Sequence, residues 1–313
     1  MKIDYLDQNK WIDLARAAKS PDQERDLHAL LVSLCRDVEQ GRLLLPLSST
    51  TIYETHKINN PERRRHLASV QAALSGGVVF RGRNRRLDAE ISDVLADAYG
   101  LPREDRAPMW FLSNIFPEAF AESDNPSTGL KISARLLKMM QSDPTAFLVD
   151  FLSSEINRAA AVAKLSAGSK RLLERIEARR TAQIGETLAM RRRIYAATLL
   201  IEEIDRVLSI AARMGLKFAN AAELGSTNAR RIARDVATLD VERELALRIE
   251  GQSRSLEEND LRDMQAFCAV VPYADIVVAE NQFVSLAVQA KLPSKYKTTL
   301  TTNIFDLKSA AAD

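Results

Sequence analysis

The sequence predicts an α/β protein in which a central parallel sheet is flanked by helices and interrupted by a long helical segment. Short apolar runs alternate with helical patterns at both ends of the chain, which is the order that produces parallel strands joined by helices. Between about residue 88 and residue 250, helical periodicity continues with almost no strand pattern. Gly (11 residues) and Pro (10 residues) are scarce, which favours helix through most of the length.

The first 80 residues are predicted to contain three short strands separated by pairs of helices. The strands are expected at residues 3–7, 43–48 and 78–80. The helices are expected at about residues 10–18, 21–40, 50–57 and 61–74. This order, β-α-α-β-α-α-β, indicates a parallel sheet covered by helices.

The α/β pattern resumes at about residue 256. A helix is expected at 257–271, a strand at 276–279, a helix at 282–291, and a strand near 298–302 before a closing helix. We therefore predict one discontinuous α/β domain, residues 1–85 and 256–313, with an all-helical insertion at residues 86–255. Two consecutive domains are the alternative, but they leave the C-terminal strands without an obvious sheet.

Composition and motifs narrow the function classes. The net charge of +2 is close to neutral, so local Arg clusters must carry any binding of a polyanion. Cys35 and Cys268 lie in apolar helical patterns and are interpreted as buried reduced thiols. With no signal sequence and no apolar run long enough for a bilayer, a cytoplasmic protein without a membrane partner is expected. No phosphate-cradling Gly-rich loop or Gly-x-Ser-x-Gly elbow supports a nucleotide-driven motor or a serine hydrolase.

Acidic residues stand where predicted strands end. Asp7 directly follows the first strand, and Glu280 closes the strand at 276–279. Because the carboxyl ends of parallel strands meet at one edge of a sheet, these carboxylates should pool there and favour a divalent metal. Glu54 lies on the helix after the second strand. Taken alone, each acid is also explained as a helix cap or a first-turn acid.

Other acidic residues are further candidates for the metal ligands. Asp260 and Asp263 lie three residues apart at the start of a helix, and so on a similar face. Asp275 enters the strand that Glu280 closes, and at about 3.3 Å per extended residue the two are separated by more than about 10 Å. Both cannot readily bind one ion, so Glu280 is preferred and Asp275 is given a supporting role. Asp4, within or before the first strand, is a poorer ligand candidate.

Four segments together resemble PIN-like nucleases, over roughly residues 1–80 and 256–310. These segments are residues 5–9, 48–54, 259–263 and 272–280. The resemblance implies a three-layer α/β fold in which four acids bind Mg²⁺ or Mn²⁺: one after the first strand, one on the helix after the second, one at the start of a later helix, and one after the fourth strand. The matching positions are Asp7, Glu54, Asp263 (with Asp260 as its rival) and Glu280, and Asn9 matches the polar residue that follows the first acid.

The resemblance implies a metal-dependent nuclease that hydrolyses phosphodiester bonds. It favours an endoribonuclease, with RNA expected ahead of DNA, and a toxin or phage-defence effector as the setting. Two departures bear on this expectation: Glu280 stands where Asp is commoner, and minimal PIN toxins lack the long helical middle. A catalytically inactive nucleic-acid-binding or scaffold protein stays open as an alternative, as does a structure-specific DNA nuclease.

A basic loop is expected after the third strand. It contains Arg81, Arg83, Arg85 and Arg86, and a flexible basic loop near the sheet edge would suit phosphate contacts with nucleic acid. A solvated face paired with nearby acids explains these arginines equally well. A protein partner or inhibitor on the helical insertion, and a homo-oligomer, also stay open.

Overall fold

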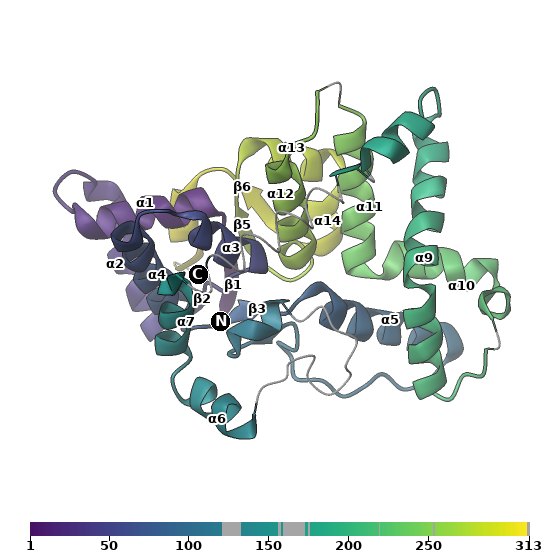
Figure 1. Ribbon diagram of the computed structural model, residues 1–313, viewed down its shortest axis with the longest axis horizontal. Coiled ribbons are helices and arrows are strands. Elements are labelled where there is room, and N and C mark those ends of the chain that lie inside the picture. Colours follow the sequence, from purple (N-terminus) through teal and green to yellow (C-terminus); the bar gives the residue numbers. More distant parts are fainter. Residues whose placement is uncertain are drawn as a thin grey trace.

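The central parallel sheet joins strands from the two ends of the chain. The computed structural model describes residues 1–120, 133–155, 158, 173–174, 176–218, 220–252 and 254–311 (Figure 1). It is a mixed α/β, mostly helical protein with a four-stranded parallel sheet in the order β2-β1-β5-β6. The strands are β1 (Lys2–Leu6), β2 (Leu43–Leu44), β5 (Ile276–Val278) and β6 (Thr299–Thr301). The predicted α/β class and parallel sheet are confirmed.

The register places the carboxyl ends of the two central strands side by side. Asp4 lies opposite Ile276, and Leu6 lies opposite Val278. The ladder continues one residue past β1, where the Asp7 backbone N–H donates to the Val278 carbonyl at 2.9 Å. All pairs in this sheet are parallel, so the chain leaves every strand at the same edge.

The third predicted strand pairs with the chain just after β2. In β3 (Val79–Phe80), Val79 forms a parallel bridge with Leu47, and the Phe80 N–H donates to the Leu47 carbonyl at 2.9 Å. β3 also pairs antiparallel with β4 (Leu112–Ser113), a strand that the sequence did not predict. The expected strand at 43–48 is regular only at its first two residues, because Pro46 has no N–H to donate to a ladder.

Helices flank the strands at both ends of the chain. The N-terminal helices are α1 (Gln8–Lys19), α2 (Arg25–Glu39), α3 (Ser49–Lys57) and α4 (Pro61–Ser75). The C-terminal ones are α12 (Glu258–Val270), α13 (Asn281–Gln289), α14 (Leu292–Tyr296) and the 3₁₀ helix η2 (Ile304–Ala311). Side-chain caps fix the first turns: Ser48 accepts from the Thr51 N–H at 3.1 Å, and Asn60 accepts from the Arg63 N–H at 2.9 Å.

The middle of the chain is helical, as predicted. Its elements are α5 (Arg83–Tyr99), η1 (Phe116–Phe120), α6 (Ala134–Ser142), α7 (Pro144–Ser153), α9 (Leu188–Arg213), α10 (Ala221–Asp235) and α11 (Ala237–Glu250). Apolar residues recur among many Arg and Glu over residues 170–214, which predicts one or two long amphipathic helices. α9 lies in this range, and residues 170–172 and 175 lie outside the described residues. None of the helices in the described ranges is long and apolar enough to cross a membrane.

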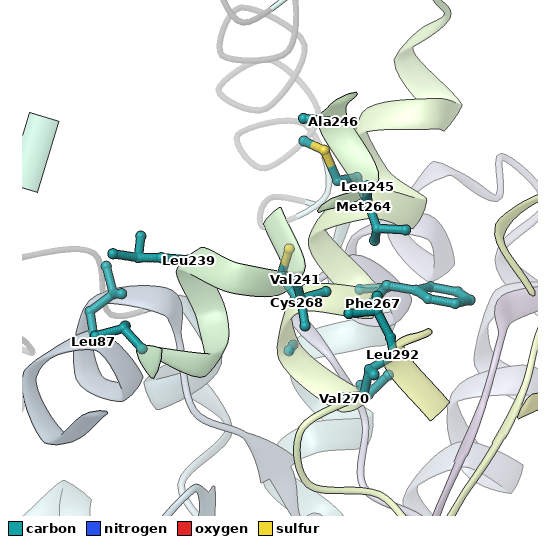
Figure 2. Close-up of a cluster of buried hydrophobic side chains, with 14 of the residues drawn as sticks. Leu87, Leu239, Val241, Leu245, Ala246, Met264, Phe267, Cys268, Val270 and Leu292 are labelled. Atoms are coloured by element: carbon teal, nitrogen blue, oxygen red, sulfur yellow. The ribbon is translucent and has the colours of Figure 1, made fainter. Parts of the chain in front are cut away.

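A hydrophobic core lies on each face of the sheet. Successive strand residues alternate between the two cores: Tyr5 contributes to one and Leu6 to the other. The first core continues into α5, α9 and α11, and Figure 2 shows Leu87 of α5 and Leu239 of α11 in the same cluster as Phe267 of α12. In the second core, residues of α7 pack beside those of α4. The helices expected to form a separate insertion therefore share both cores with the sheet.

Candidate metal centre

Two of the predicted acids lie at the carboxyl edge of the sheet. Asp7 follows β1 directly, and Glu280 lies two residues beyond β5. The Asp7 carboxylate accepts from the Gln8 N–H at 2.8 Å, and the Asn9 side-chain amide donates to Glu280 Oε1. Burial raises the pKa of Asp7; the Gln8 hydrogen bond opposes this, and the charge of Glu280 adds to it. Asp7 and Glu280 are therefore close enough to repel each other.

Glu54 of α3 and Asp263 of α12 complete a set of four interacting acids. Burial, followed by the charge of Asp7, raises the pKa of Glu54 to about 7, against the opposing charges of Arg262 and Lys57. Burial, followed by the charges of the other three acids, raises the pKa of Asp263 to about 8. Since α3 packs against α12, four separate segments bring these carboxylates within electrostatic range of one another.

Asp260 has a structural role that its rival Asp263 lacks. Its side chain is 6% exposed and completes a capping box, accepting from the Glu257 N–H at 2.8 Å. It also receives hydrogen bonds from Arg254 at 2.8 Å and Gln282 at 3.2 Å. Burial acts to raise the pKa of Asp260, but the bonds from Arg254 and Glu257 outweigh it and the pKa is lowered. Both Asp260 oxygens are engaged by the protein, so Asp263 is the better candidate ligand.

Asp275 and Asp4 pair the two central strands instead of joining the cluster. Asp275 precedes β5, and its carboxylate accepts from the Ile3 N–H at 2.8 Å. Asp4 is fully buried and accepts from the Ile276 N–H at 3.1 Å. Asp275 therefore lies at the opposite end of β5 from Glu280. Its carboxylate contacts the Ile3 backbone and not the other acids, so the structure gives no direct support to the role expected for it.

The basic segment after β3 is not the flexible loop that was expected. Gly82 is the N-cap of α5, so the segment from Arg83 onward is helical. Its ion pairs are internal: Arg81 with Glu118 (2.6 Å), Arg83 with Glu203 (2.5 Å) and Arg83 with Glu242 (3.0 Å). Arg86 is 4% exposed and donates to the Arg81 carbonyl, and Arg85 also interacts within the protein. These arginines hold α5 in place, so phosphate contacts from them have no structural support.

Sequence reasoning missed one residue of the cluster, Arg262. Its side chain is 5% exposed, and its Nε lies 3.3 Å from Glu54 Oε1. Its Nη1 lies 2.8 Å from Glu258 Oε1, one helical turn earlier. The spacing of Glu258 and Arg262 at i and i+4 in an otherwise apolar helix face was the available signal.

The donor set suits a hard cation in an open site. All four candidate ligands are carboxylates, which Mg²⁺ and Mn²⁺ prefer. Across the described ranges, no group of three or more His, Cys, Asp or Glu side chains is placed so that it could hold a metal ion. Mg²⁺ usually keeps several waters and takes one or two carboxylates together with substrate phosphate. The four carboxylates therefore suit such an ion by the chemistry of their donor atoms, and not by a preformed arrangement.

A cavity of about 550 Å³ lies at the same edge of the sheet. One wall is Lys10, one turn after Asp7, and another is the segment 302–305 after β6. Its acids are Asp13, Asp22, Glu24 and Asp26, and its bases are Lys10 and Arg25. With more acids than bases, the cavity does not attract a polyanion by itself, and a bound cation would offset this charge.

No known family, curated protein or solved structure matches the chain. The chemistry of the site therefore has to come from its own residues.

Proposed function

We propose that this protein is a metal-dependent nuclease of the PIN-like type that hydrolyses phosphodiester bonds. Asp7, Glu54, Asp263 and Glu280 would hold Mg²⁺ or Mn²⁺ at the carboxyl edge of the sheet. The observation that carries the proposal is the placement of the acids: Asp7 and Glu280 follow the carboxyl ends of the two central strands, and α3 and α12, which carry Glu54 and Asp263, pack against each other. Carboxylates brought together in this way repel one another, and a divalent cation would turn that repulsion into attraction.

The protein's contribution to the reaction is mainly positional. A bound divalent cation supplies Lewis acidity toward the phosphoryl oxygen and lowers the pKa of a bound water. Asp7 is fixed by its cap bond to Gln8, and Glu280 is oriented by Asn9. In the metal-free site, burial and the neighbouring acids raise the pKa of Glu54 and of Asp263, whereas as ligands of a bound cation both groups would be ionised. No side-chain nucleophile is needed.

Single-stranded RNA is the first substrate to test, and the family resemblance favours it. The cavity beside Lys10 is lined by none of the four acids, so it gives no support to one substrate over another. The helical middle that shares the two cores extends the protein well beyond a minimal nuclease domain, which leaves flapped or branched DNA as the rival substrate.

The decisive experiment compares the wild type with Asp7→Asn and Asp275→Asn. Asp275 is a matched control because it is an acid at the opposite end of β5. With Mn²⁺ and single-stranded RNA, single-stranded DNA or flapped DNA, we expect the wild type and Asp275→Asn to cleave RNA. Asp7→Asn should be slower by about 10²-fold or more, because a metal contributes several kcal/mol and each 1.4 kcal/mol is about tenfold in rate.

Equal activity of Asp7→Asn and the wild type would rule out the site. A preference for flapped DNA would identify a structure-specific DNA nuclease. No cleavage of any substrate together with no binding of Mn²⁺ would favour a catalytically inactive scaffold.

A further inference from the structure

A buried guanidinium lies against one of the four acids, Glu54. The Arg262 side chain is 5% exposed, and its Nε is 3.3 Å from Glu54 Oε1. Arg262 also precedes Asp263 directly in α12. Within the described part of the chain, no other Lys or Arg forms an ion pair with Asp7, Glu54, Asp263 or Glu280. Arg262 is thus the internal cation in direct contact with the cluster.

Arg262 is held in place without the help of Glu54. Its Nη1 pairs with Glu258 at 2.8 Å, and its Nη2 donates to the Asn259 side chain. The guanidinium also lies over the Tyr53 ring, 5.6 Å from the ring centroid. Glu258 and Asn259 lie on α12 itself, so the positive charge would stay beside the site if the Glu54 carboxylate turned toward a metal ion.

This charge has opposite effects on the empty and the filled site. In the empty site it offsets one of four negative charges, and it opposes the rise in the pKa of Glu54. In the filled site it would repel the divalent cation and compete with it for Glu54, because like charges repel strongly where burial screens them little.

We infer that Arg262 is a resident counterion that stabilises the metal-free cluster and weakens its affinity for the divalent cation. It therefore sets the cation concentration at which the site fills. Arg262 is a positioning residue, since it acts through Glu54 and not on substrate. The inference rests on the metal site proposed above.

The test measures Mn²⁺ binding by calorimetry and thermal unfolding in EDTA and in saturating Mn²⁺. The variants are Arg262→Met, Arg262→Lys and the control Arg254→Met, which removes an arginine paired with the neighbouring acid Asp260. We expect Arg262→Met to bind Mn²⁺ about tenfold more tightly or more, because one positive charge has left the cluster. Its melting temperature should fall in EDTA and recover in Mn²⁺. Arg262→Lys and Arg254→Met should keep roughly the wild-type affinity.

A purely structural role for Arg262 predicts a different result. The melting temperature would then fall equally in EDTA and in Mn²⁺, with the affinity unchanged or weaker, and that outcome overturns the inference while leaving the metal site intact. Absence of Mn²⁺ binding by the wild type overturns both proposals. If the methionine variant does not fold, Arg262→Gln removes the same charge and keeps a donor for Glu258.

Discussion

The side chain of Asn9 donates a hydrogen bond to Glu280, a residue 271 positions away in the chain. Both side chains are exposed, so the bond adds little to the free energy of unfolding, and its main effect is to orient the Glu280 carboxylate. We expect Asn9→Ala to weaken Mn²⁺ binding by about tenfold, the low end for loss of a residue that orients a ligand. Calorimetric titration measures this directly.

Gln282→Ala is the matched control for Asn9→Ala. Gln282 is also exposed and lies two residues beyond Glu280, but it donates to Asp260 at 3.2 Å. Its removal should leave Mn²⁺ affinity unchanged. If both variants lost affinity equally, the orienting role of Asn9 would be wrong.

The metal-free protein should lose stability as the pH rises, and Asp263 should be a main cause. Its pKa is raised from 3.8 to about 8 by burial and by the neighbouring acids, so the folded state holds a proton that the unfolded state releases. The free energy of unfolding therefore falls between about pH 4 and pH 8. At pH 8 in EDTA, Asp263→Asn should be more stable than the wild type by about 2 kcal/mol, at roughly 1.4 kcal/mol per pKa unit and with allowance for coupling.

Urea unfolding at pH 4 and pH 8 checks this prediction. The two proteins should be nearly equal at pH 4, and saturating Mn²⁺ at pH 8 should stabilise the wild type alone. A less stable Asp263→Asn at pH 8 in EDTA would show that the acid is not under electrostatic strain.

Asp4 should destabilise the protein at alkaline pH for a separate reason. It is fully buried, its Oδ2 has no hydrogen-bond partner in the described structure, and burial followed by the charge of Asp275 raises its pKa to about 7. Stability is therefore lost between about pH 4 and pH 7. We expect Asp4→Asn to gain about 1–3 kcal/mol at pH 8, because the buried charge is gone while an oxygen remains for the Ile276 N–H. Its Mn²⁺ affinity should match the wild type, and a tenfold change would place Asp4 in the site.

Two adjacent glycines test how α7 docks beside the sheet. Gly77 has φ +74°, and a Cβ there would lie 2.7 Å from the carbonyl carbon of Pro144, the first residue of α7. Gly76 has φ +60°, but a Cβ added there would have no atom within 4 Å. Gly76→Ala should cost about 1 kcal/mol for the left-handed backbone alone, and Gly77→Ala about 3 kcal/mol because α7 must also move. Equal costs in urea unfolding would mean that α7 adjusts freely.

Sequence patterns located the elements better than the contacts between them. Apolar runs placed β1, β3, β5 and β6 to within about two residues, and strand ends placed Asp7 and Glu280 at one edge. The sequence could not decide between Asp260 and Asp263, because both lie on similar faces of α12. The structure favours Asp263 as the ligand, because Asp260 is already bonded to Arg254, a loop residue, and no local sequence pattern reveals that pairing. β4 was missed because two residues carry no alternation.

The sequence also does not reveal what the apolar faces of the middle helices pack against; only the tertiary structure shows this. The periodicity of α9 and α11 shows that each has an apolar face, but it does not show what that face meets. The structure buries these faces in the core that Tyr5 and Val277 share, so the middle helices are not a detached body. For the same reason the sequence left two interpretations of the arginines after β3 open, since the acidic partners of Arg81 and Arg83 lie on η1, α9 and α11.

The central strand has a consequence for biosynthesis. β1 is made some 270 residues before its partner β5, since Asp4 pairs with Ile276. Pairing across such a separation is slow and must wait for the late segment. Until then Asp263 and Glu280 do not yet exist beside Asp7, so the nascent chain lacks half of the proposed ligands. If the protein is a ribonuclease, this topology keeps it inactive until the segment that carries Asp263 and Glu280 has been translated.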